Sequence, residues 1–140
     1  MVEAVELVRS LYESYQDRDW ERAAGFLHPR VVLDMPSTAE RLEGREAVID
    51  FQRHYPEPWG DLIVLRVLAD AEGAAAEVRI VDPSGPTFAL AAFWRCDEDL
   101  LGHGVEYWLE VGAGLPPPGR ASSPITEGAR RAWVDRSRVP

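Results

Sequence analysis

His103-Gly-Val-Glu-Tyr-Trp-Leu-Glu-Val111 is the most informative segment of the sequence, because its pattern is typical of a strand along its whole length. Glu106 and Trp108 then share one face of the strand. The residues of the opposite face are Val105, Tyr107 and Leu109. A carboxylate beside an aromatic ring is desolvated when its face lines a cavity, which raises its proton affinity toward the range used in general acid/base catalysis. The function therefore depends on which face points inward.

Three amphipathic helices are expected in the first half of the chain. The first covers Val5–Tyr15, where apolar residues recur every three to four positions. The second begins after Asp19, a good N-cap residue, and ends before Pro29. A strand over Val31–Met35 follows, and a third helix runs from about residue 44 to residue 55, where prolines end it.

The periodicity changes to that of strands in the second half. The predicted strands are residues 62–69, 74–81, 87–96 and 103–111. Their connections are short and rich in turn residues, which predicts antiparallel neighbours. Helices grouped first and strands grouped later predict an α+β fold, a curved antiparallel sheet partly wrapped around the helices.

One domain of about residues 1–115 accounts for most of the 140 residues. Residues 116–140 form a tail that begins with three prolines and holds five arginines against two acids. Its composition is typical of disorder, but the apolar pair Trp133-Val134 can dock such an arm over a pocket mouth or onto a neighbouring subunit. The sequence leaves both alternatives open.

Composition excludes several classes of function. The net charge is −9, so the chain should repel nucleic acid. All 15 basic residues are arginine, which rules out a Schiff-base lysine, lysine-bound pyridoxal phosphate and the lysine of a phosphate-binding P-loop. Cys96 is the only cysteine, which predicts a reducing, cytoplasmic location. No apolar run reaches the ~20 residues of a membrane span.

Three motifs follow one another at a suggestive spacing. They are Val31-Val32-Leu33 before Asp34-Met35-Pro36, then Gly44-Arg45-Glu46, then Glu106-Tyr107-Trp108. Their order, across about residues 4–111, resembles the nuclear transport factor 2-like superfamily and the SnoaL-like group within it. The resemblance implies a cone-shaped fold with a deep pocket between sheet and helices. Members include polyketide cyclases, ketosteroid isomerases, dehydratases, limonene epoxide hydrolases and proteins without catalysis, so fold alone does not choose a function.

The limonene epoxide hydrolases give the closest comparison of residues. The resemblance places their water-holding pair on Val32 and Asp34, their central arginine and aspartate on Ala75 and Glu77, and their closing aspartate on Glu106. Valine cannot hydrogen-bond a water and alanine cannot bridge carboxylates, so epoxide hydrolysis by that route is not expected.

The ketosteroid isomerases match less well. Their first-strand acid falls nearest Asp34 or Met35 of this chain, and their later acid falls nearest Ala91, so the resemblance favours that chemistry less still.

The candidate catalytic residues are Glu106, Glu77, Asp34 and Arg79. Counting by two, together with the comparison above, puts all four on one face of the sheet. An arginine between carboxylates can keep one ionised and leave the other protonated, with Glu106 as the principal acid or base. The alternative is that Glu77 and Arg79 form a solvated pair on the outer face. The candidate ligand contacts are Trp108, Val32, Phe88, Leu90, Tyr55, Trp59 and Tyr15.

The face opposite the charged set is expected to be apolar. Its members are Leu33, Met35, Ala76, Val78, Ile80, Val105, Tyr107 and Leu109. Either this face is the core and the charged set lies outside, or a second subunit covers it and the charged set lines the cavity. The second choice predicts a homodimer built sheet to sheet.

The sequence thus predicts a protein that binds a small, mostly apolar molecule and acts on it by general acid/base chemistry: hydration, isomerisation or cyclisation. No metal or redox cofactor is required, and His28, His54 and His103 lack a metal-ligand spacing. A non-catalytic ligand-binding domain is the alternative, so whether the chain is an enzyme stays open. A third possibility is a module whose apolar sheet face binds a different protein.

Overall fold

The computed structural model describes residues 3–56, 59–82 and 85–133. The helices are α1 (Ala4–Gln16), α2 (Trp20–Ala24), α3 (Arg45–Arg53) and α4 (Glu127–Trp133). The strands are β1 (Leu27–Met35), β2 (Glu40–Glu43), β3 (Asp61–Ala69), β4 (Gly73–Val81), β5 (Thr87–Asp97) and β6 (Leu100–Glu110). The sequence predicted each of these elements except β2 and α4, with ends that differ by a few residues.

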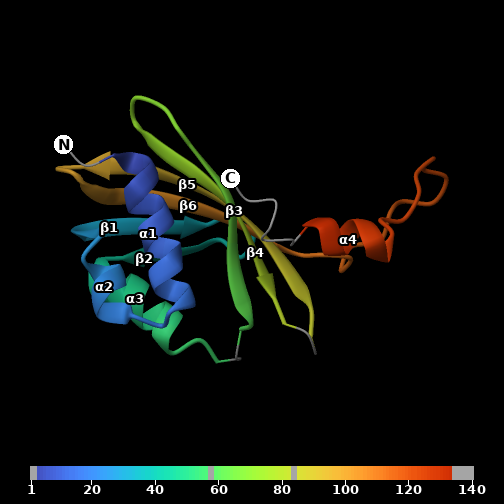
Figure 1. Cartoon of the computed structure of the whole chain (residues 1–140), viewed down its shortest axis with the longest axis horizontal. Coiled ribbons are helices and arrows are strands. Elements are labelled where there is room, and N and C mark those ends of the chain that lie inside the picture. The colour runs from blue at the N-terminus through green and yellow to red at the C-terminus, as the bar shows by residue number, and fades with distance from the viewer. Residues whose placement is uncertain (1–2, 57–58, 83–84, 134–140) are drawn as a thin grey trace.

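All six strands belong to one sheet in the order β2-β1-β6-β5-β4-β3. Every neighbouring pair is antiparallel except β1 and β6, which run parallel. The sheet is curved and does not close on itself, and α1, α2 and α3 lie together against its concave side (Figure 1). The predicted α+β fold with a cone-shaped sheet around N-terminal helices is confirmed.

Local chemistry explains where α2 and α3 begin. Asp19 caps α2, because its side chain accepts a hydrogen bond of 3.1 Å from the Arg22 amide. Gly44 precedes α3 with a positive φ of 92°, which a residue with a side chain adopts only with strain. Its amide donates to the Val31 carbonyl at 2.7 Å, which ties the start of α3 to β1.

The core lies between α1 and the inner face of the sheet. On α1 the buried stripe is Leu7, Val8, Leu11, Tyr12 and Tyr15. On β1 and β4 alternate residues point inward, and these are Val31, Leu33, Met35, Ala74, Ala76, Val78 and Ile80. The burial of these apolar side chains fixes the face that each strand turns to the helices.

The apolar face expected from the sequence is divided between the two sides of the sheet, so that expectation is wrong. Leu33, Met35, Ala76, Val78 and Ile80 point into the core. Tyr107 and Leu109 are exposed on the outer face of β6. Val105 lies on the same face, two residues before Tyr107. The cause is that β6 has the reverse pattern of β1 and β4, with its apolar side chains outside and Glu106 inside.

The chain leaves the cone after β6. Residues 112–131 are exposed throughout, and α4 lies apart from the sheet and the other helices (Figure 1). The expected anchor Trp133-Val134 lies outside the described side chains, so the role of the tail stays a prediction. Among the described residues, no helix is long and apolar enough to cross a membrane.

Candidate functional site

A buried carboxyl group is the centre of the site. Glu106 lies on the inner face of β6 with 1% of its surface exposed. The Tyr12 hydroxyl donates a hydrogen bond of 2.6 Å to Glu106 Oε2, and the Trp108 indole N–H donates one of 3.2 Å to Oε1. The Trp94 indole N–H in turn donates to the Tyr12 oxygen at 2.9 Å. Each oxygen of the carboxyl group therefore has a donor, as a buried charged group requires.

Three elements position this network. Tyr12 belongs to the buried stripe of α1, Trp94 to β5, and Glu106 and Trp108 to β6. Trp94 pairs in register with Gly104, and a Cβ atom at Gly104 would lie 2.6 Å from the Trp94 ring. A glycine is thus required there, because any larger residue would push the indole away from Tyr12.

Burial determines the protonation of the two central groups. Desolvation raises the pKa of Glu106 above its ordinary value of 4.5, while the hydrogen bonds from Tyr12 and Trp108 lower it and only partly offset burial. Burial, and next the Glu106 carboxylate, raise the pKa of Tyr12 well above its ordinary value. Tyr12 therefore stays protonated and remains a hydrogen-bond donor to Glu106.

A pocket of about 420 Å³ opens beside this network, between α3, the turn after β1 and the ends of β4, β5 and β6. Its apolar lining is Met35, Phe51, Tyr55, Trp59, Ile80, Pro86, Phe88 and Trp108. Its other lining residues are Ser37, Thr38, Glu40, Gln52, Gly60 and Asp82. Glu106 does not line the pocket, and Trp108, which donates to it, does.

Arg18, which does not line the pocket, holds the pocket residue Trp59 in position. Its guanidinium lies 3.5 Å from the centre of the Trp59 ring, a cation–π contact. The same guanidinium donates to the Trp59 carbonyl at 2.8 Å. The segment that leads into β3 is therefore held against the end of α1, with Trp59 turned to the pocket.

The predicted ligand contacts fall into two groups. Trp108, Phe88, Tyr55 and Trp59 line the pocket, as expected. Leu90 and Tyr15 are buried in the core instead, and Val32 points to the outer face, because Val31 and Leu33 on either side of it are buried. The expectation that these last three line the pocket is wrong.

Asp34 lies on the outer face of the sheet, away from Glu106. Arg41 on β2 donates to both of its oxygens, at 2.6 and 3.0 Å, and His103 Nε2 lies 3.0 Å from Oδ2. The hydrogen bonds from Arg41, and next those from His103, lower the pKa of Asp34 to about 2. The predicted convergence of Asp34 with Glu106 is wrong, since the inward positions of β1 are taken by apolar residues.

Glu77 and Arg79 also lie on the outer face. They alternate on β4 with the core residues Ala76, Val78 and Ile80. Arg79 Nη2 lies 3.4 Å from Glu77 Oε2, and Arg66 Nε on β3 lies 3.2 Å from Glu77 Oε1. The pair lies on the outer face, as the alternative had it, but it is not the solvated pair of that alternative, because Arg79 is buried.

Three residues of the site escaped the sequence analysis: Tyr12, Trp94 and Gln52. Tyr12 was assigned to the buried stripe of the first helix, but nothing local indicated that its hydroxyl would meet a carboxylate 94 residues away. Gln52 is a polar residue on the buried face of α3, with Val48 and Ile49. That break in the apolar stripe was the available signal.

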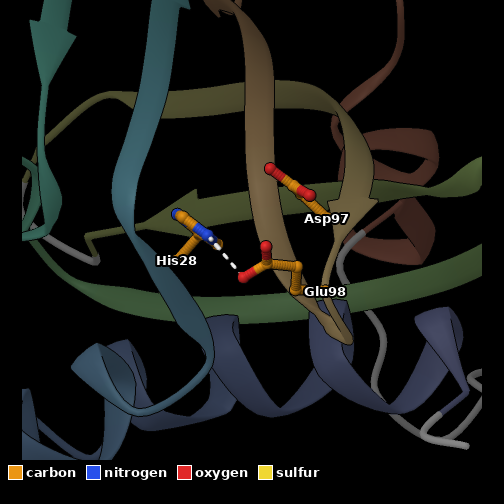
Figure 2. Close-up of side chains that lie close together, drawn as sticks. All are labelled: His28, Asp97 and Glu98. Carbon is orange, nitrogen blue, oxygen red and sulfur yellow. Dashed lines mark hydrogen bonds and ion pairs between the residues drawn. The ribbon is translucent and has the colours of Figure 1, made fainter.

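In the described part of the chain, His28, Asp97 and Glu98 lie close enough together to be considered as ligands of a metal ion. Figure 2 shows the His28 ring pointing at the Glu98 carboxylate, with Asp97 nearby. Nε2 lies 3.3 Å from Glu98, and Nδ1 accepts a hydrogen bond from the Arg30 amide. The proton of the neutral ring is therefore on Nε2, where a metal would have to displace it. The arrangement fits a contact that fastens β1 to the β5–β6 turn.

Comparison with known proteins decides the family. The SnoaL-like domain matches residues 8–101, which is well over half of the chain. The chain belongs to the SnoaL-like family. A crystal structure from Kribbella flavida, described as a candidate ketosteroid isomerase, superposes on this SnoaL-like protein with a TM-score of 0.75 and 31% identity over 84% of each chain.

Two further structures share the fold. An epoxide hydrolase of M. tuberculosis, described as similar to limonene epoxide hydrolase, gives a TM-score of 0.64 at 16% identity over 75% of this chain and 81% of that one. An NTF2-like protein of unknown function from Burkholderia xenovorans gives 0.69 at 17% identity over 81% and 86%. No functionally curated protein matches the sequence.

Replacing Tyr12 by Phe tests the network in this SnoaL-like protein. The change removes one donor from Glu106 and leaves the Trp94 N–H buried without its acceptor. We expect the free energy of unfolding to fall by about 1–3 kcal/mol in denaturant titrations. The pKa of Glu106 should rise further, as measured by NMR of its carboxyl carbon. Tyr55→Phe, at the exposed pocket rim, is the control and should match the parent.

The pH dependence of stability tests the burial of Glu106. Folding raises the pKa of Glu106. The stabilisation that results from this shift is therefore complete at a pH below the pKa of the unfolded state, and it is lost as the pH rises through the pKa of the folded state. We expect the free energy of unfolding of the parent, relative to Glu106→Gln, to decrease from pH 4.5 upward, by at most about 1.4 kcal/mol per pH unit. Glu110→Gln, at an exposed position on β6, should follow the parent. An increase with pH would show a depressed pKa instead.

Proposed function

We propose that this SnoaL-like protein is an enzyme that transfers a proton on a small, mostly apolar molecule, with Glu106 as both base and acid. The supporting observation is a buried carboxyl group of raised pKa that bonds to Trp108, a wall residue of the 420 Å³ pocket. A carboxyl group whose pKa is raised toward neutral pH can accept and return a proton efficiently. Such chemistry needs neither a metal ion nor a redox cofactor.

One carboxyl group suffices for isomerisation or aldol-type cyclisation, and these reactions are proposed over hydration. Asp34 and Glu77, the acids expected to support Glu106, lie on the outer face and cannot activate a water beside it. In the isomerisation of a β,γ-unsaturated ketone, the Glu106 carboxylate would take the proton from the α-carbon, and the resulting acid would return it to the γ-carbon. The similarity to the Kribbella flavida protein supports this choice, although Glu106 does not occupy the positions at which the resemblance places the acids of ketosteroid isomerases.

A non-catalytic ligand-binding domain is the second candidate, and one observation favours it. Both Glu106 oxygens already accept hydrogen bonds, and the Trp108 indole separates the carboxyl group from the pocket. Catalysis requires this indole to move and release Oε1. Binding in the pocket requires no such movement.

Replacing Glu106 by Gln tests the catalytic proposal. The parent is incubated in D₂O with a panel of β,γ-unsaturated cyclic ketones, and deuterium incorporation and conversion to the conjugated isomer are measured. We expect the Gln variant to lose about 10²–10⁴ in rate, because the amide cannot accept the proton. Glu110→Gln, on the exposed end of the same strand, should keep the parental rate.

Ligand affinity separates the two candidate functions. The quenching of tryptophan fluorescence by each ketone gives its affinity for the parent and for Glu106→Gln, which should agree within a few-fold. Binding without deuterium incorporation in the parent would reject the enzyme and retain the ligand-binding domain. A Gln variant with the full parental rate would remove Glu106 from the mechanism.

The outer face of the sheet supports a proposal about assembly. Phe93 and Tyr107 are about half exposed, at 52% and 51%, and their rings meet edge to face at 5.9 Å. Leu109 and Leu68 are exposed as well. Exposed apolar groups of this kind mark binding surfaces, and the proposed occupant is a second copy of the chain, sheet against sheet. The cytoplasmic location expected from the sequence likewise stays a proposal.

Replacing Phe93 by Asp tests the proposed homodimer. We expect the parent to have the mass of a dimer by light scattering at micromolar concentration, and the Asp variant to have that of a monomer, because a charge would be buried unpaired. Ala71→Asp, at an exposed position in the β3–β4 turn, should stay dimeric. A parent that is monomeric at every concentration would contradict the dimer and favour a different protein as partner.

A further inference from the structure

Gln52 is a polar residue on the buried, otherwise apolar face of α3. It lies on α3 one turn after Val48 and Ile49, on the face that packs into the molecule, and only 8% of its surface is exposed. Glutamine is seldom this buried unless it is hydrogen-bonded. A residue of this type at this position needs an explanation that packing does not give.

The Gln52 amide has no hydrogen-bond partner among the residues that the structure describes. The only glutamine side-chain hydrogen bonds in the described part of the chain belong to Gln16. Because Gln52 lines the pocket, the accessible remainder of its side chain opens into that space. The carboxamide thus offers two N–H donors and one oxygen acceptor to whatever occupies the pocket.

The rest of the pocket lining makes Gln52 the polar group of the interior. Of the residues that line the pocket, the three that are buried are Met35, Ile80 and Gln52. Ser37, Thr38 and Glu40 are exposed and belong to the rim. Ligand pockets typically combine an apolar wall with a few polar groups that fix the orientation of the ligand.

We infer that Gln52 is the specificity-determining residue of the pocket and binds the uncharged oxygen of the ligand, a ketone carbonyl, through its amide N–H. This inference rests on the proposed small-molecule pocket and adds the ligand class to it. A neutral amide does not compensate an ionised group, and the acidic lining residues Glu40 and Asp82 disfavour anions. The ligand is therefore a neutral, apolar ring compound with one carbonyl group that enters the pocket first.

A pair of isosteric probes isolates the contact of the carbonyl group. The probes are 2-acetylnaphthalene and 2-isopropenylnaphthalene, which differ in whether the branch carries an oxygen or a CH₂ group. Their affinities are measured by competition and by tryptophan quenching, for the parent and for Gln52→Leu. We expect the parent to prefer the ketone over its isostere by about tenfold, and the Leu variant to lose this preference through weaker ketone binding.

Two variants control for pocket shape and for substitution on α3. Gln52→Met keeps the length of the side chain without the amide, and it should behave as the Leu variant does. Arg53→Leu changes the next residue of α3, which is exposed and does not line the pocket, and it should keep the parental preference. A thermal unfolding scan adds an independent readout, because the Gln52 amide makes no hydrogen bond within the described part of the chain and its removal should leave the midpoint unchanged or raise it.

The possible outcomes separate this inference from the proposed function. Equal affinity of the parent for both probes would overturn the role of Gln52 and leave the pocket intact. A lowered unfolding midpoint with an unchanged ketone preference would make Gln52 a structural residue, which also overturns it. If the parent binds neither probe, the small-molecule pocket itself fails and the role of Gln52 fails with it.

Discussion

The burial of the Glu106 carboxyl group couples α1, β5 and β6 through hydrogen bonds. A carboxyl group with 1% of its surface exposed is tolerated only if its oxygens are hydrogen-bonded. Tyr12 and Trp108 provide those bonds, and Trp94 holds the Tyr12 hydroxyl in place. The positions of α1, β5 and β6 are therefore coupled through polar contacts and not only through apolar packing. A shift of any of the three would leave a charged group buried without partners.

The reversed pattern of β6 connects the pocket with the outer surface. Most strands of this sheet turn their apolar residues inward, but β6 turns Glu106 inward and Tyr107 and Leu109 outward. Because strand side chains alternate, the inward face of this part of β6 holds Glu106 and Trp108 while the outward face holds Val105, Tyr107 and Leu109. One strand thus places an acid in the interior and apolar side chains on the outer surface. The candidate site and the proposed dimer face are two consequences of one alternation.

How far the sequence predicts this structure depends on whether a feature is local. The first three helices, the long strands and the curved α+β sheet follow from periodicity, caps and turn residues, and they were predicted, while the cone shape was predicted from the family resemblance. Glu106 and Trp108 were placed on one face correctly, since that needed only counting along one strand. Asp34 and Glu77 were assigned to the wrong face of the sheet, because their side depends on how β1 and β4 are oriented relative to β6. The apolar residues beside them, Leu33 and Val78, decide that orientation through burial.

The two buried polar residues of the site differ in what satisfies them, and this difference implies a division of roles. Hydrogen bonds from Tyr12 and Trp108 offset the cost of desolvating the Glu106 carboxyl group before any ligand binds, and they hold the group in position. Gln52 has no partner in the described part of the chain, so its hydrogen-bonding capacity is available to a ligand. The hydrogen bonds that Glu106 already accepts hold its carboxyl group in position, and proton transfer from a ligand requires Trp108 to release Oε1 first. The Gln52 amide makes no such bond in the described part of the chain, so a ligand with a matching oxygen can pair with it. Trp108 lies at the boundary of the two, since it lines the pocket and bonds to Glu106.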